Sequence, residues 1–157
     1  MPDEFNEFAI EQLNSAGGLI FGRVTYQHMA AWWPTPAAVA NDPIVAGKMN
    51  SLPKYVFSRT LKAVDWNNTT LFKERAAEEI AGLKQQLTKD LYIFGSANLA
   101  GTFSAQGLID EYRLMMNPVV LGRGQPLFTG GMGKLELKLL HARPFKSGNV
   151  LLSYGPA

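Results

Sequence analysis

The 157-residue sequence contains no cysteine, and this absence excludes disulfides, thiolate zinc sites and catalysis by a cysteine nucleophile. It contains only two histidines, His28 and His141, and no acidic cluster of the calcium-loop type, so no metal site is expected. Charged residues make up 18% of the chain and the net charge is +2, which is too little and too dispersed to indicate a nucleic-acid partner. Any site for an anion must therefore be local.

Long hydrophobic runs are also lacking, since no apolar segment approaches the roughly 20 residues that cross a membrane. The first seven residues are acidic and polar, which is not the pattern of a signal peptide. We therefore expect no membrane partner and, by default, a cytoplasmic location. What the chain does have is 46% hydrophobic residues in a length typical of one domain, so residues 1–157 are expected to fold around a single core.

The hydrophobic pattern alternates between helical and strand-like periods and becomes strand-rich toward the end of the chain. Short, wholly apolar strands separated by helices favour a parallel sheet covered on both faces, with antiparallel strands added at one edge. Gly17 and Gly18 are expected to end the first helix. The expected helices are 3–16, 24–33, 43–50, 74–87 and 97–106; the expected strands are 18–21, 54–58, 91–94, 112–121, 135–143 and 150–154, with a loop at 35–41 and a loop followed by a short extended piece at 66–72.

Three of the expected strands end with the same chemistry: an apolar run with phenylalanine, a small residue, and then hydroxyl or basic groups. The three segments are 19–25, 55–60 and 92–98. In a parallel sheet such strand ends meet at one edge, where open α/β folds bind ligands. The start of each following helix attracts anions, and Arg23 and Arg59 suit a phosphate. Any one of these ends is more simply an ordinary turn, but the three together favour a phosphate-binding edge.

The same residues indicate which nucleotide the edge would take. The sequence has neither a Gly-x-Gly-x-x-Gly fingerprint nor a Walker lysine motif, so the usual dinucleotide and P-loop sites are not expected. If the ligand is a dinucleotide, Ser58, Arg59 and Thr60 suit a 2′-phosphate better than a free ribose, which normally meets an acidic residue. NADPH is therefore preferred over NADH.

Six segments, in order along nearly the whole chain from about Phe5 to Tyr154, carry a family resemblance. They are 22–25, 57–60, 94–97, 107–114, 117–124 and 126–128. Together they resemble the dihydrofolate reductase superfamily, and within it the reductases similar to the C-terminal domain of the riboflavin-biosynthesis protein RibD. The resemblance implies a three-layer α/β fold with a mostly parallel mixed sheet, helices on both faces and antiparallel C-terminal strands. It also implies a homodimer, with NADPH as hydride donor to a pterin or 5-amino-6-ribosylaminouracil type of substrate.

Carried over to this sequence, the family's motifs supply a set of cofactor residues. Those expected to bind NADPH are Gly22, Arg23, Thr25, Ser58, Arg59, Thr60, Gly95, Ser96 and Ala97, with Leu99 packing nearby. Because classical dihydrofolate reductases have a cis Gly-Gly bond at the last of these turns, a cis bond between Gly95 and Ser96 is a hypothesis here.

Substrate contacts are expected from four residues. Pro118, Gly122 and Gly124 resemble the turn that leads toward the family's substrate pocket, although turn punctuation between strands explains them equally well. Trp33 offers a flat ring on which a heterocycle could stack. Its alternative role is to close the core where a helix ends.

The sequence departs from the family's pattern in two ways. The family's usual first strand, with the loop that covers the substrate, is not found before the helix that starts at Asp3. Since that strand lies inside the sheet, its absence is expected to leave two neighbouring strands with unpaired main-chain groups and an open apolar slot. The family's proton donor also falls on Asn6, which cannot titrate. Glu7 and Glu11 are weak catalytic candidates, because a solvated acidic face explains them as well.

Three hypotheses therefore remain open. The leading one is an NADPH-dependent reductase of a small heterocycle. The second is a nucleotide-binding or scaffold protein of the same fold that has lost catalysis, with a truncated reading frame as one origin. The third is an assembly in which a partner or sister chain supplies the missing strand.

Overall fold

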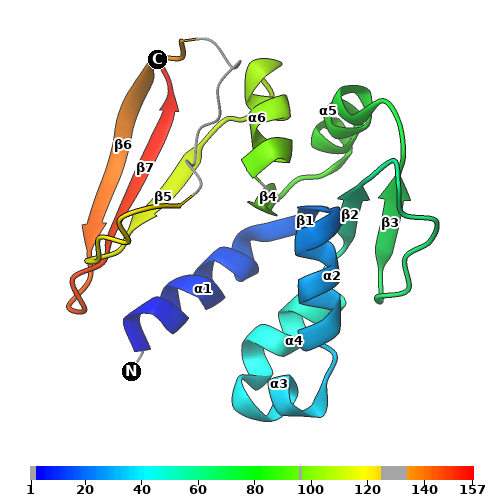
Figure 1. Cartoon of the computed structure of the whole chain (residues 1–157), viewed down its shortest axis with the longest axis horizontal. Coiled ribbons are helices and arrows are strands. Elements are labelled where there is room, and N and C mark those ends of the chain that lie inside the picture. Colours follow the sequence, from blue (N-terminus) through cyan, green and yellow to red (C-terminus); the bar gives the residue numbers. More distant parts are fainter. Residues whose placement is uncertain (1–2, 96, 125–133) are drawn as a thin grey trace.

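The computed structural model describes residues 3–95, 97–124 and 134–157, and it is built from six helices and seven strands within those ranges (Figure 1). In chain order the elements are α1 (Asp3–Ser15), β1 (Ala16–Gly22), α2 (Arg23–Trp32), α3 (Pro36–Asn41), α4 (Pro43–Ser51), β2 (Lys54–Phe57), β3 (Thr69–Phe72), α5 (Ala76–Gln86), β4 (Asp90–Gly95), α6 (Ala97–Ala105), β5 (Tyr112–Met116), β6 (Leu137–Pro144) and β7 (Val150–Pro156). None of these helices is long and apolar enough to span a membrane.

The strands of the first two-thirds of the chain form a parallel sheet with helices on both faces, as the sequence predicts. Its order is β3-β2-β1-β4, and every pairing within it is parallel. On one face, Leu19 and Phe21 of β1 pack with α1, α2 and α4; on the other, Ile20 packs with Ile80 of α5 and Phe103 of α6. Figure 1 shows α2–α4 on one side of this sheet and α5 and α6 on the other.

Gly17 and Gly18 do not end the first helix in a turn, as the sequence pattern suggested, but lie inside β1, which follows α1 directly. The reason is close packing rather than turn geometry. A Cβ atom on Gly18 would lie 2.7 Å from Cε2 of Tyr55 and 2.9 Å from Cδ2 of Leu91, and one on Gly17 would lie 3.0 Å from Cβ of Lys89. The two glycines therefore let the neighbouring strands approach β1.

The expected loop at 35–41 is also wrong, because residues Pro36–Asn41 form the short helix α3. The side chain of Thr35 accepts a hydrogen bond from the main-chain N–H of Ala38, and Pro36 occupies the first turn of the helix, where its missing N–H costs nothing. Threonine followed by proline is a typical start of a helix, and the prediction of a loop overlooked this signal.

The C-terminal strands are antiparallel, as expected, but they form a sheet of their own with the order β5-β7-β6. In Figure 1 this second sheet stands apart from the parallel sheet, with α1 running between them. The contacts that attach it to the rest of the chain include Phe8 against Phe145, with ring centroids 6.2 Å apart, the Arg143–Glu11 ion pair, and a hydrogen bond between the hydroxyls of Ser104 and Tyr112. The strand expected at 112–121 ends at Met116, two residues before Pro118.

The division between the two sheets falls at the predicted slot. Among the described strands, β4 pairs only with β1 and β5 pairs only with β7, so one edge of each has no neighbouring strand. A cavity of about 550 Å³ lies beside both edges and is lined by residues of β4, α5, α6 and β5. The described strands therefore leave a slot between β4 and β5.

Candidate functional site

The carboxyl ends of β1, β2 and β4 lie side by side at one edge of the parallel sheet. The register pairs Gly22 of β1 with Phe57 of β2, and Phe21 of β1 with Gly95 of β4. The three strand ends singled out in the sequence are therefore brought together, with β1 in the middle. We call this region the carboxyl edge and define it as residues 22–25, 58–60 and Gly95.

The centre of the carboxyl edge is the start of helix α2. Gly22 is the residue before the first turn, is buried, and provides no side chain to bind the helix's first N–H groups. The first turn contains no acidic residue, and Arg23 is exposed, with its guanidinium 3.2 Å from Oε1 of Gln27. Uncapped N–H groups, the positive end of the helix dipole and an adjacent arginine together fit a phosphate. Thr25, two residues after Arg23 in the first turn of α2, carries a hydroxyl group and is half-buried.

The second part of the edge is a tight turn organised by Ser58. Its hydroxyl oxygen accepts hydrogen bonds from the main-chain N–H groups of Thr60 and Leu61, each at 3.2 Å. Its own N–H donates to the carbonyl oxygen of Phe72 at 3.0 Å, which ties the turn to the end of β3. Arg59 and Thr60 are consequently held on a fixed main chain with their side chains in solvent. An exposed guanidinium on a rigid turn can form the two parallel hydrogen bonds that a phosphate accepts.

The third part is the turn from β4 into α6. Gly95 ends β4 beside Phe21, and Ala97 begins α6. Leu99 is half-buried in the hydrophobic cluster that contains Ile20 and Phe103, so its position is that of a packing residue. Ser96 lies outside the described residues, and the hypothesis of a cis bond at Gly95–Ser96 falls there with it.

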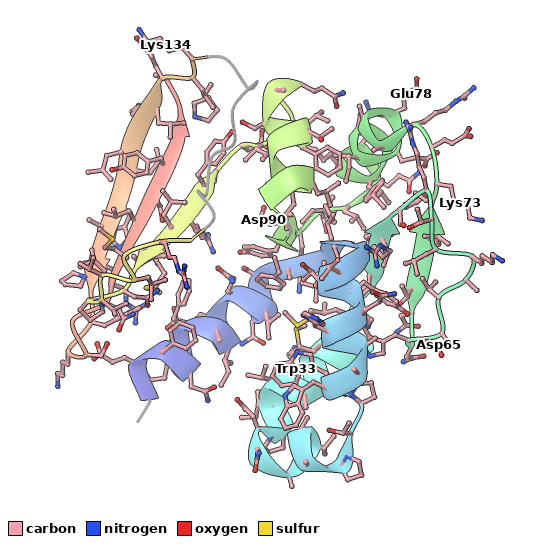
Figure 2. All side chains as sticks on the ribbon, in the orientation of Figure 1. Trp33, Asp65, Lys73, Glu78, Asp90 and Lys134 are labelled. Carbon is pink, nitrogen blue, oxygen red and sulfur yellow. The ribbon has the colours of Figure 1, made fainter. Side chains whose placement is uncertain are left out.

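The residues expected to contact substrate lie elsewhere. Trp33 follows the last residue of α2 (Figure 2), about 15 Å along the helix from its start at the carboxyl edge. It is half-buried against the core, and its indole N–H lies 3.3 Å from the sulfur of Met29. Pro118 lies against Gly148 in the turn between β6 and β7. Gly122, with φ of 85°, and Gly124 are exposed in the segment after β5. These positions match the packing and turn roles that the sequence left open.

The two acidic candidates both lie on α1. Glu7 is exposed, and Glu11 lies 3.5 Å from the guanidinium of Arg143 on β6. The ion pair directs Glu11 toward the antiparallel sheet. Asn6 in the same helix has no titratable proton to donate. The described residues thus place no titrating carboxyl at the carboxyl edge.

Sequence reasoning missed a polar network that crosses the space between the two sheets. Nη1 of Arg113 on β5 lies 3.1 Å from Oε1 of Gln12 on α1 and 3.1 Å from the hydroxyl of Tyr92 on β4. That hydroxyl is also 2.6 Å from Oγ of Ser15. Burial acts to lower the pKa of Arg113, but hydrogen bonding to Glu111 and the proximity of Tyr92 raise it above its usual value, so the side chain stays charged. No local pattern signals this network, because its members are far apart in the sequence.

Comparison with known proteins agrees with this fold. The model of the RibD C-terminal domain matches residues 2–151. The chain belongs to the RibD C-terminal domain family. Among the chain's relatives is the uncharacterized protein YyaP of Bacillus subtilis (strain 168). The two sequences are 34% identical over 142 residues, which are 90% of this chain and 75% of that protein.

Solved structures place this RibD C-terminal domain in a wider fold group. A putative riboflavin biosynthesis protein from Shewanella sp. PV-4 superposes with a TM-score of 0.74 at 23% identity, covering 99% of this chain and 81% of the other. The dihydrofolate reductase of Enterococcus faecalis, solved with NADP(H) and RAB-propyl, superposes with a TM-score of 0.64 at 13% identity, covering 96% and 81%. The chain therefore has the dihydrofolate reductase-like fold.

Proposed function

We propose that this protein is an NADPH-dependent reductase that transfers a hydride to a small heterocyclic substrate of the pterin or aminouracil type. The observation that carries the proposal is the convergence of three strand ends beside the uncapped start of α2, with Arg23 and Arg59 exposed at the same edge. Membership of the RibD C-terminal domain family and the likeness to a dihydrofolate reductase solved with NADP(H) support it.

Each part of the edge has a distinct role in this proposal. The N–H groups at the start of α2 and Arg23 bind the charge of the cofactor's phosphates, and Gly22 and Gly95 allow the cofactor to lie close to the main chain. Arg59 on the Ser58 turn binds the 2′-phosphate. The bound cofactor supplies the hydride, and the protein contributes the binding and orientation of the two reactants.

The test of the cofactor is a calorimetric titration with NADPH and with NADH. Replacing Arg59 by alanine removes a charge-assisted pair of hydrogen bonds worth about 1.5–3 kcal/mol, so NADPH should bind about 10- to 100-fold more weakly. NADH affinity should stay the same, since NADH lacks the 2′-phosphate. Lys134→Ala is the matched control: it removes one positive charge at an exposed site on the antiparallel-sheet side of the molecule (Figure 2) and should change neither affinity. Failure of the wild-type protein to bind NADPH, or equal losses for the two cofactors, would contradict the proposal.

A second function is favoured by the position of the acidic residues. Since Glu11 is paired with Arg143 and Asn6 cannot titrate, the fold is also compatible with a nucleotide-binding protein that lacks turnover. The two functions separate when NADPH consumption is followed by absorbance with pterins, aminouracil phosphates and simple carbonyl compounds. Turnover with one of these substrates establishes the reductase, whereas tight NADPH binding without turnover on any of them establishes the binding protein.

A further inference from the structure

Arg59 lies in the connection between β2 and β3, residues 58–68, which contains no helix or strand. The sheet positions only the two ends of this connection, so side chains must hold the rest of it in place. One fixed point is the Ser58 turn, which is tied to the end of β3 and whose last residue, Leu61, packs against the core. The other fixed point lies at residues 65 and 66. Arg59 is therefore placed by two anchors, one on each side of the segment 62–64.

The second anchor is the hydroxyl of Tyr26 in α2. This oxygen accepts hydrogen bonds from the main-chain N–H groups of Asp65 and Trp66, at 3.2 and 3.3 Å, and the hydroxyl donates a long hydrogen bond of 3.5 Å to Oδ1 of Asp65. A phenol hydroxyl has two lone pairs and one hydrogen, so its capacity is fully used here. Tyr26 and Trp66 are both buried, and loss of the hydroxyl would leave the N–H of Trp66 without its acceptor.

Trp66 is also fixed from two other sides, which makes it a firm end for the connection. Its indole N–H donates to Oδ1 of Asn50 in α4 at 2.9 Å, and the side-chain amide of Asn50 donates to the carbonyl oxygen of Trp33 at 3.0 Å. The ammonium group of Lys54 in β2 lies 4.4 Å from the centroid of the Trp66 ring. The Trp66 side chain is thus held by α4 and β2, and the Tyr26 hydroxyl adds the link from its main chain to α2.

We propose that the Tyr26 hydroxyl is a positioning group that sets the place of Arg59 relative to the start of α2, and with it the preference for NADPH over NADH. Tyr26 is the fourth residue of α2, whose uncapped start binds the cofactor's other phosphates in the proposed function, on which this inference rests. The 2′-phosphate and those phosphates belong to one ligand, so both contacts form only when the turn and the helix are correctly spaced. The buried hydroxyl acts through Arg59 and is not itself a binding group.

The experiment is a calorimetric titration of the full chain and of its Tyr26→Phe variant with NADPH and with NADH. Phenylalanine keeps the ring that lies beside Trp66 and removes only the hydroxyl. NADPH should bind about tenfold more weakly to the variant, near the lower end of the loss expected for Arg59→Ala, because the guanidinium is present but no longer held in place. NADH affinity should not change. Tyr112→Phe, which removes a hydroxyl that is hydrogen-bonded to Ser104 near the end of α6, is the matched control and should change neither affinity.

A double-variant cycle separates positioning from a general structural role. In the Arg59→Ala protein, Tyr26→Phe should weaken NADPH binding by no more than about twofold, because the group through which the hydroxyl acts is already gone. Additive losses, or equal losses for NADPH and NADH, would overturn the inference. Melting curves establish that each variant is folded.

Hydrogen exchange of the ligand-free protein distinguishes failure of this inference from failure of the proposed function. Tyr26→Phe should speed exchange at residues 60 and 61, in the Ser58 turn, as well as at residues 65 and 66, because the turn loses its distant anchor. Faster exchange at 65 and 66 alone would overturn the inference, whatever the protein binds. If the wild-type protein does not bind NADPH although exchange quickens at all four residues, the proposed function fails and the placing of the turn by Tyr26 stands.

Discussion

The ammonium group of Lys54 allows a quantitative prediction, because it is buried and, among the described residues, no carboxylate accepts a hydrogen bond from it. Lys54 starts β2 and is 0% exposed. Its Nζ donates to the carbonyl oxygens of Met49, Asn50 and Leu52 at 2.8, 3.1 and 2.8 Å, and lies 4.4 Å from the centroid of the Trp66 ring. The side chain therefore binds the last carbonyl groups of α4 and holds that helix against the strand that leads to the Ser58 turn.

Burial lowers the pKa of Lys54 from 10.5 to about 8, so desolvation of the charge outweighs the three carbonyl acceptors. Between these two values the unfolded chain binds more protons than the folded chain. The free energy of unfolding must then rise with pH in this window, because the cost of the buried charge is present in full below about pH 8 and is relieved toward pH 10.5. From about pH 7 to about pH 9.5 the gain is about 1–2 kcal/mol after allowance for screening by solvent.

The assay is urea unfolding of the wild-type protein and of Lys54→Met at these two pH values. Methionine keeps the length of the side chain and removes the titrating group, so the difference between the two proteins isolates Lys54 from other titrations. The free energy of unfolding of the wild-type protein should rise relative to that of the variant as the pH rises, by the amount given above. Lys138→Met, at an exposed position of β6, is the control and should show no pH-dependent difference. A difference that is constant or that falls with pH would refute the reasoning, since it would mean that the carbonyl groups hold the proton.

Two further predictions concern packing and association. Gly18→Ala should lower the free energy of unfolding by about 1–3 kcal/mol, because the added methyl group would lie 2.7 Å from the Tyr55 ring. Gly82→Ala in α5, where a Cβ atom would meet nothing within 4 Å, should instead raise the free energy of unfolding by about 0.5–1 kcal/mol. The same urea unfolding assay measures both. We also propose that the protein is a homodimer whose interface covers the exposed run Val119–Leu121, in which Val120 is 94% exposed. Val120→Glu should then halve the mass measured by light scattering, whereas the control Lys73→Glu should leave the mass unchanged. A monomeric wild-type protein would contradict this proposal.

The elements that sequence reasoning found are those whose signal is local. Apolar runs of four residues gave the parallel strands, and the shared ends of 19–25, 55–60 and 92–98 gave the carboxyl edge, because parallel strands bring equivalent ends together. Reliance on local signals also explains why Gly17 and Gly18 of β1 were predicted to be the end of a helix. A glycine pair after a helix has the local signature of a helix end, whereas the contacts that require Gly18, with Tyr55 and Leu91, come from strands that are distant in the sequence.

The slot and the network around Arg113 mark the limit of local reasoning. Comparison with a family pattern predicted an open slot, but nothing in the sequence indicated that Arg113, Tyr92 and Gln12 would bridge its walls. Residues 12, 92 and 113 meet only because α1, β4 and β5 pack around a position where no described strand lies. Contacts of this kind depend on the whole fold, so no periodic pattern in the sequence indicates them.

Strand β4 borders both the carboxyl edge and the slot. One of its edges pairs with β1, and its last residue, Gly95, belongs to the carboxyl edge; its other edge is a wall of the slot. Among the described strands, the main-chain groups on that second edge have no partner in a sheet. The strand that ends at the carboxyl edge is therefore held by sheet hydrogen bonds from β1 alone, and the packing of Ile93 and Leu91 against the cluster of Ile20, Ile80 and Phe103 supplies the rest of its support.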